Sequence, residues 1–439
     1  MYSIGDRVKT KEYWKEAIAI SKEIGHRKLE VDCCLFLGGV FFKDGECVKA
    51  EEQFSKSLKI SKNIGDAAQQ CISLVALAHL RLQKGKNQEA TSYLLTAIQK
   101  CEKMRASLRD NDHWKISYTD SNILLYHTLC ALFCQTGNPE KALYVSELGK
   151  ARALADLMSA RYSVMSQVSA NPETWAGIET IMDRELSCSC LYVSYSLDRI
   201  YFWILKNNGL PHFLQIEGKE TITYEGSVKN VEDFFATKRF RSLGMSPRPT
   251  ELNKGESSNA MQGKSNSFEE ASHEGFRIGN ESKENQGPKM NLPLCYKLII
   301  APVVGWLEGS EIIVVPDRSL YNIPFAALPD ESGKTLSETF KIRVAPSLTT
   351  LRLIHDSPTD YHSQIGALIV GNPDVGEVIF KGRLTSISRL PYAEKEAIMV
   401  GRKLGLEPLI GQQATKQAVL EAMNSVALIH LAAHGDSER

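Results

Sequence analysis

The sequence has no excess of charge, no long apolar run and no secretion signal. Lys plus Arg and Asp plus Glu each total 52 residues, so the formal net charge is zero. Without a net positive field, general attraction to nucleic acid or to an anionic membrane surface is not favoured. The first residues, MYSIGDRVKTKEYWKEA, hold no apolar core of signal-peptide length. No stretch approaches the roughly 18 apolar residues that a membrane span requires. We therefore expect a cytoplasmic protein without a membrane span.

Patterns for binding metals and nucleotides are also missing. The ten cysteines are accompanied by no histidines at ligand spacing. They include three close pairs, which are Cys33 and Cys34, Cys130 and Cys134, and Cys188 and Cys190. The segment GNPDVG (371–376) lacks the Lys-Ser/Thr that completes a phosphate-binding loop. We expect no metal and no cofactor, and we interpret the cysteines as reduced thiols of an intracellular chain.

Residues 1 to about 160 contain internal repeats. Shifting the sequence by 40 residues aligns it with itself, and a third copy follows after a longer connection. In each copy a leucine, a glycine and an alanine recur at the same offsets: Leu37, Gly45 and Ala50; Leu77, Gly85 and Ala90; Leu129, Gly137 and Ala142. Apolar residues spaced by three and four indicate helices. The glycines fall between two helical runs, where a tight turn needs a positive φ.

Each copy is predicted to be a helical hairpin that cannot bury its apolar face alone. Stacked neighbours bury this face together, which gives an α-solenoid with an extended groove. The pattern resembles the tetratricopeptide repeat (TPR), in a 40-residue variety, over residues 1–160. An unrelated helical bundle is the alternative, and the fixed offsets of the three copies argue against it. Residues 6–24 align with the second helix of a hairpin, so we expect the sequence to begin inside a longer array.

Residues 161–439 form the second predicted domain. Residues 191–216 change to the period of strands, with turns at 197–199 and 207–209, and the Asn-Gly pair of the second turn is a strong hairpin signal. Residues 228–240 have a helical pattern. Residues 241–291 are rich in Ser, Asn, Glu, Lys and Gly and poor in apolar residues, so we predict a disordered insertion.

After the insertion, strand and helix patterns alternate. A helix from Leu292 leads to a strand at 312–315, which we expect to pair with the residues that follow a turn at 316–318. Strands at 366–370, 406–410 and 426–435 then alternate with helices at 392–404 and from Thr415 to about Met423. This β-α-β-α-β order predicts a mainly parallel sheet with helices on both faces. The predicted fold class is therefore α plus α/β, a helical solenoid followed by an α/β domain.

Three motifs of this second domain, VPDRSLYNIPFAALPD, LPYAEKEA and IHLAAHG, resemble the CHAT domain. That family is caspase-like and is typically fused to tetratricopeptide repeats. The resemblance implies a cysteine peptidase clan with a His–Cys dyad. Here it makes His434 the general base and the amide of Gly435 part of the oxyanion hole. A site at the carboxyl end of a strand agrees with the rule for open α/β sheets. The alternative is a strand-end histidine without a catalytic role, and His430 is expected to be structural.

The nucleophile that the resemblance implies has no counterpart in this sequence. The family's cysteine follows the strand after the histidine strand, whereas the sequence ends at Arg439 and its last cysteine is Cys295. A histidine without a thiol has nothing to activate, so we expect a truncated, caspase-like CHAT domain without peptidase activity. The apolar strand at 426–432 would then have an open edge, which is a predicted aggregation risk.

Two functional hypotheses remain. In the first, the protein is a scaffold that binds other proteins through its TPR groove, and the CHAT domain is an interaction or regulatory module. In the second, a longer form is a cysteine endopeptidase whose repeats recruit substrate. Nucleic-acid binding is a poor third, because no basic stripe with stacking aromatics is present. The resemblance also implies a role in cell division. We favour the scaffold.

Overall fold

The computed structural model describes residues 4–434 apart from several gaps. These gaps are residues 109–111, 165–176, 179, 186, 197–198, 208, 210, 219–230, 232–290, 364 and 381–382. The predicted insertion, except for Asn291, and nearly all of the helix predicted at 228–240 lie outside the described residues. The chain divides into two compact units, of which the first comprises Met1–Thr237 with Asn291–Tyr361 and the second comprises Lys238–Met290 with His362–Arg439.

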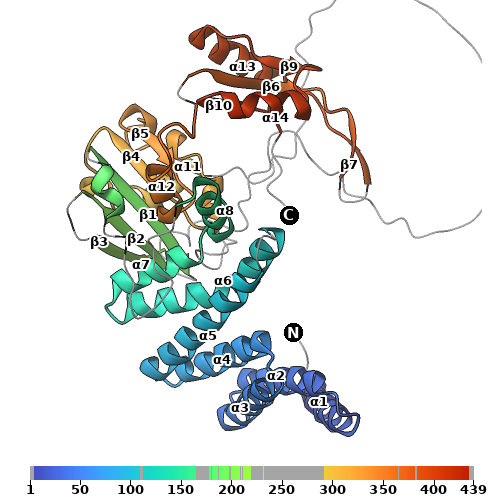
Figure 1. Ribbon diagram of the computed structural model, residues 1–439. Helices are drawn as coiled ribbons and strands as arrows, with labels where there is room; N and C mark the ends of the chain where they lie inside the picture. Colours follow the sequence, from blue (N-terminus) through green and yellow to red (C-terminus); the bar gives the residue numbers. More distant parts are fainter. Residues whose placement is uncertain are drawn as a thin grey trace, which may run out of the picture. The chain divides into compact units, whose positions relative to one another are not determined.

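The first unit begins with helices that pair as the repeats predict (Figure 1). The helices are α1 (Ile4–Glu23), α2 (Arg27–Lys43), α3 (Cys47–Asn63), α4 (Ala67–Gln83), α5 (Asn87–Ser107), α6 (Asp112–Gln135) and α7 (Pro139–Leu148). The hairpins are α2–α3, α4–α5 and α6–α7. The turns of these hairpins contain Gly45, Gly85 and Gly137, with φ values of 77°, 70° and 73°, which confirms the predicted left-handed turn.

Small residues allow the helices of each hairpin to approach closely. Ala50, Ala90 and Ala142 are fully buried, as the repeats predict. At Gly38 of α2, a β-carbon would lie 2.5 Å from the ring of Phe54 on α3. Helix α4 contacts both α2 and α3 of the preceding hairpin. The hairpins therefore stack on one another, and the predicted solenoid is confirmed.

A five-stranded sheet follows the repeats in the same unit, in the order β3-β2-β1-β4-β5. Its strands are β1 (Cys188–Ser196), β2 (Arg199–Leu205), β3 (His212–Glu217), β4 (Glu311–Val315) and β5 (Lys341–Val344). β1, β2 and β3 are antiparallel neighbours, which confirms the two predicted hairpins, and β4 and β5 run parallel to β1. The unit also contains α8 (Arg152–Tyr162), α11 (Leu292–Ile299) and α12 (Leu348–His355).

The helical repeats and this sheet share one hydrophobic core. Trp203 of β2 and Tyr192 of β1 belong to the same cluster of buried side chains as Leu129 of α6 and Leu143 of α7. The indole Nε1 of Trp203 donates to the carbonyl oxygen of Pro139, at 2.8 Å, where α7 begins. The domain boundary predicted at residue 160 stays a prediction, and the packing of this unit runs across it.

One predicted strand pairing is wrong. The residues after β4 form short 3-10 helices, Arg318–Asn322 and Phe325–Ala327, instead of a second strand. Arg318 has a φ of 46°, which turns the chain away from an extended course. β4 instead lies between β1 and β5, and Ile312 to Val315 are fully buried. A continuous apolar run with no alternation is typical of such a central parallel strand.

The second unit contains the predicted β-α-β-α-β series. Its elements are β6 (Ala367–Pro373), α13 (Pro391–Leu404), β9 (Leu409–Gly411), α14 (Lys416–Ala422) and β10 (Leu428–Ala432). The strands are parallel in the order β10-β6-β9, and the Thr415 hydroxyl caps α14 as expected. A hairpin of β7 (Glu377–Phe380) and β8 (Arg383–Ser386) was not predicted. No helix in the described part of the chain is long and apolar enough to cross a bilayer.

Candidate functional site

Exposed apolar side chains recur on the first helices of the three hairpins. When the repeats are aligned, Ile72 and Leu124 correspond to Asp32, which lies 40 and 92 residues before them. Phe36 lies one turn after Asp32 and so on the same side of α2. The residues Phe36, Ile72 and Leu124 are 57%, 50% and 62% exposed. We call these three residues the first-helix face.

The first-helix face is held by contacts between neighbouring helices. Trp14 of α1 stacks on Phe36, with ring centroids 4.8 Å apart. The side-chain amide of Gln69 on α4 donates to the carboxylate of Asp32 on α2, at 2.6 Å. Exposed apolar side chains on successive helices make this side of the array a candidate for contacting another protein.

His434 lies two residues after β10, at the carboxyl end of a parallel strand, as predicted. Its Nε2 is 2.7 Å from the carbonyl oxygen of Ser388, and because a carbonyl oxygen only accepts, Nε2 carries the proton in this contact. Nδ1 is buried and has no hydrogen-bond partner among the described residues. A neutral imidazole with an unprotonated nitrogen can act as a base. The catalytic role of His434 stays a prediction, and Gly435 lies outside the described residues.

The other histidine of this strand is placed differently. His430 lies within β10, and its Nε2 is 3.2 Å from a carboxylate oxygen of Glu396 on α13. β10 is at one end of its three-stranded sheet, and the side chains of Leu428, Ile429 and Leu431 are exposed there. The strand thus presents an apolar edge in the described part of the unit, and its tendency to aggregate stays a prediction.

All ten cysteines lie in the first unit, so the second unit offers His434 no thiol. Nine of the ten are buried, and only Cys47 is partly exposed. Burial raises the pKa of Cys34 to about 11. Burial and a hydrogen bond to Glu185 raise the pKa of Cys188 to about 12. Such thiols are almost entirely protonated at neutral pH and are poor nucleophiles.

The thiols should therefore differ sharply in their reaction with an aromatic disulfide reagent. In the native chain we expect one fast-reacting thiol, Cys47, and in the denatured chain we expect all ten to react. The absorbance of the released thiolate measures both numbers. Replacing Cys47 by serine should remove the fast phase. A native chain with several fast thiols would contradict the burial described here.

A fully buried lysine joins the last repeat to the sheet. Lys150 follows α7, and its ammonium group donates to the carbonyl oxygens of Val193 (3.3 Å) and Pro316 (3.2 Å). The same nitrogen lies 3.8 Å from the centre of the Tyr192 ring, at the range of a cation–π contact. Burial lowers the pKa of Lys150, and the charge of the nearby Asp317 opposes that shift.

Asp317, the residue after Pro316, supplies the opposite charge at this junction. Its carboxylate accepts a hydrogen bond from the Ser194 hydroxyl at 2.7 Å and lies 3.7 Å from Nε2 of His127. Burial raises the pKa of Asp317, but Lys150, His127 and Arg318 outweigh it and hold that pKa below its ordinary range. Neither of these two buried charges was expected from the sequence. The available signal was the charged Pro-Asp-Arg sequence directly after an apolar strand.

Comparison with known proteins agrees with this architecture. Residues 293–439 match the CHAT domain family. The chain is similar to tetratricopeptide repeat protein 28 of Homo sapiens, with 25% identity over 80% of this chain and 17% of that protein. The Mus musculus protein of the same name is 24% identical over the same shares. The chain thus spans 17% of the length of these relatives. The chain thus combines stacked helical hairpins with a C-terminal region that matches the CHAT domain family, and it is distantly similar to tetratricopeptide repeat protein 28.

Proposed function

We propose that this protein is a scaffold that binds other proteins through its helical repeats. The first-helix face carries the proposal, because it exposes an apolar side chain on the first helix of each of three stacked hairpins. Solenoids of this kind use extended surfaces to hold a peptide or a partner helix. The similarity to proteins named for the tetratricopeptide repeat supports the same conclusion.

The CHAT domain would then respond to what the repeats bind. The core around Trp203 and the hydrogen bonds of Lys150 to Val193 and Pro316 connect the last hairpin to the sheet. That sheet includes β4 and β5, which lie within the CHAT match. A partner that alters the packing of α6 and α7 would therefore act on this sheet through direct contacts.

Replacing Phe36 and Ile72 together by serine should reduce partner capture by roughly tenfold or more. Burying each such side chain at an interface contributes about 1.5–3 kcal/mol, and serine removes that contribution. Full-length chain on beads would be incubated with cell extract, the captured proteins identified, and the affinity of each purified partner measured by titration.

Val48→Ser is the matched control, because Val48 is exposed on α3, outside the first-helix face. This variant should capture the same partners as the unchanged chain. Undiminished capture by the double variant, and also by Leu124→Ser, would show that the first-helix face is not the binding surface.

The alternative is a cysteine endopeptidase in a longer form of the protein. The observation that favours it is that Nδ1 of His434, just after β10, has no hydrogen-bond partner among the described residues. Transcript sequence that continues in frame after Arg439 into a strand followed by a cysteine would support it, and His434→Ala should then abolish peptide cleavage. A role in cell division and a location in the cytoplasm stay predictions.

A further inference from the structure

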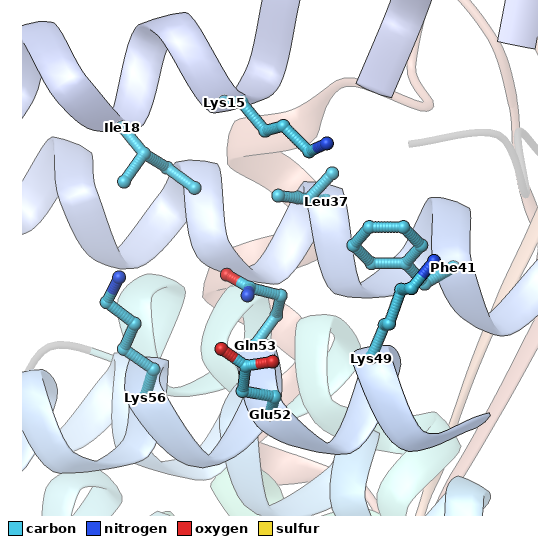
Figure 2. A pocket seen from close by; sticks show the side chains of 8 residues that line it. All are labelled: Lys15, Ile18, Leu37, Phe41, Lys49, Glu52, Gln53 and Lys56. Carbon is cyan, nitrogen blue, oxygen red and sulfur yellow. The ribbon is translucent and has the colours of Figure 1, made fainter. Parts of the chain in front are cut away.

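A cavity of about 330 Å³ lies between α1 and α3, over the middle of α2 (Figure 2). The residues that line it are Lys15 and Ile18 of α1, Leu37 and Phe41 of α2, and Lys49, Glu52, Gln53 and Lys56 of α3. α1 and α3 occupy the place of second helices in the repeat pattern, so the cavity is separate from the first-helix face.

The floor of the cavity is apolar and its rim is basic. Ile18, Leu37 and Phe41 form the floor, and lysines surround it from two helices. Figure 2 shows Lys49 and Lys56 at opposite ends of the cavity and Lys15 across from them. Lys49 pairs with Glu46 and lies over the Phe41 ring. Lys15 and Lys56 make no ion pair with another described residue. With Glu52 as the only acidic residue of the lining, the rim has an excess of positive charge.

One acceptor inside the lining lacks a hydrogen-bond donor. The Oε1 of Gln53 is buried and has no donor among the described residues. The carboxylate of Glu52 lies beside it (Figure 2). A buried acceptor without a partner is unfavourable, and a peptide N–H group entering the cavity would satisfy it. A fully ionised phosphate group has no such donor, whereas every peptide residue except proline carries a backbone N–H, so this acceptor favours a peptide.

We infer that this cavity binds an acidic peptide segment of a partner protein, with an apolar side chain on the floor and carboxylates at the lysines. This inference rests on the proposed scaffold function and names the chemistry of one partner segment. Lys49 and Lys56 are seven residues apart on α3, which is about 10 Å along a helix. In an extended peptide, residues i, i+2 and i+4 share one face and span about 13 Å, which two flexible lysine side chains can reach. The expected motif is therefore two acidic residues four positions apart, with a large apolar residue midway between them.

The test is a fluorescence anisotropy titration of the full chain with a labelled peptide. The probe is Ser-Glu-Ala-Phe-Ala-Glu-Ser, with a second peptide in which lysine replaces both glutamates and a third in which alanine replaces phenylalanine. We expect saturable binding of the first peptide in the micromolar range. Binding should weaken as salt is added, and the lysine peptide should not bind.

Charge reversal in the protein tests the geometry. Lys49→Glu with Lys56→Glu should weaken binding roughly tenfold or more, and Glu52→Gln should tighten it by about threefold, because rim charges set electrostatic complementarity. Lys59→Glu with Lys62→Glu is the matched control, since it makes the same charge change on exposed residues of α3 outside the cavity. Circular dichroism would confirm that both double variants are folded.

Three results would overturn the inference: no saturable binding of the acidic peptide, equal weakening in the control variant, or tighter binding of a single-stranded oligonucleotide or anionic vesicles than of the peptide. The proposed function would stand in each case if Phe36→Ser with Ile72→Ser still abolished partner capture. If neither set of variants lost partner capture, the scaffold proposal itself would be contradicted.

Discussion

Lys150→Met should lower the free energy of unfolding by about 2–5 kcal/mol, because it leaves two buried carbonyl oxygens without their donor and removes one of the positive charges near Asp317. Methionine fills a similar volume, so the loss of stability measures the effect of removing the charge and its hydrogen bonds to Val193 and Pro316. Chemical denaturation followed by tryptophan fluorescence measures the effect. The matched control is Lys141→Met on α7, where the lysine is exposed and the change should be within about 0.5 kcal/mol.

The same variant should make the protein more sensitive to acid. The pKa of Asp317 is depressed in the folded state, so this residue contributes stability above its unfolded pKa of about 3.9. That contribution is lost as the pH falls through the folded pKa. Without Lys150 the folded pKa rises, and the acid-unfolding midpoint should move to a higher pH. An unchanged midpoint, with unchanged stability at neutral pH, would contradict the role of this pair.

Trp203→Ala should destabilise the first unit by about 3–5 kcal/mol, the usual cost of emptying a large aromatic site in a core. Trp203 is fully buried, donates to Pro139 and packs edge-on against Tyr192, with ring centroids 5.7 Å apart. Since it joins the repeats to the sheet, we expect the helical signal and the sheet signal to be lost in one transition. Circular dichroism and thermal unfolding would show both.

Trp114→Ala on α6 is the control for this variant, because the Trp114 side chain is largely exposed. It should change the stability by less than about 1 kcal/mol. If Trp203→Ala melted the sheet while the helical repeats kept their stability, the two parts would not depend on a common core.

The helical half of the fold could be predicted closely because its signal is local. Gly45 and Ala50 mark a turn and a close approach within a single hairpin, and both are placed as predicted. The pairing of β4 was mispredicted for the opposite reason. Its partners, β1 and β5, lie far away along the chain. An apolar run such as Ile312 to Val315 predicts a buried strand but does not indicate which strand pairs with it.

In the candidate site, too, features set by local sequence could be predicted and contacts between distant residues could not. His434 could be placed at the end of a strand because a strand pattern directly precedes it. The junction of Lys150 and Asp317 could not be predicted, because the two residues come together only when β4 packs beside β1. The lysines of the cavity between α1 and α3 look like solvated surface charges in the sequence. Their excess over acidic residues becomes visible only when two helices are placed side by side.

The parallel pairing of β1 with β4 has a consequence for the protein while it is being made. β1 ends at Ser196, yet its partner begins at Glu311, and residues 197–310 must be translated between them. At about 5–20 residues per second, synthesis of that stretch takes several seconds or more. During this interval the last helical hairpin has no β4 and β5 to complete the sheet against which it packs. The nascent chain therefore passes through a period in which its apolar junction is open to chaperones.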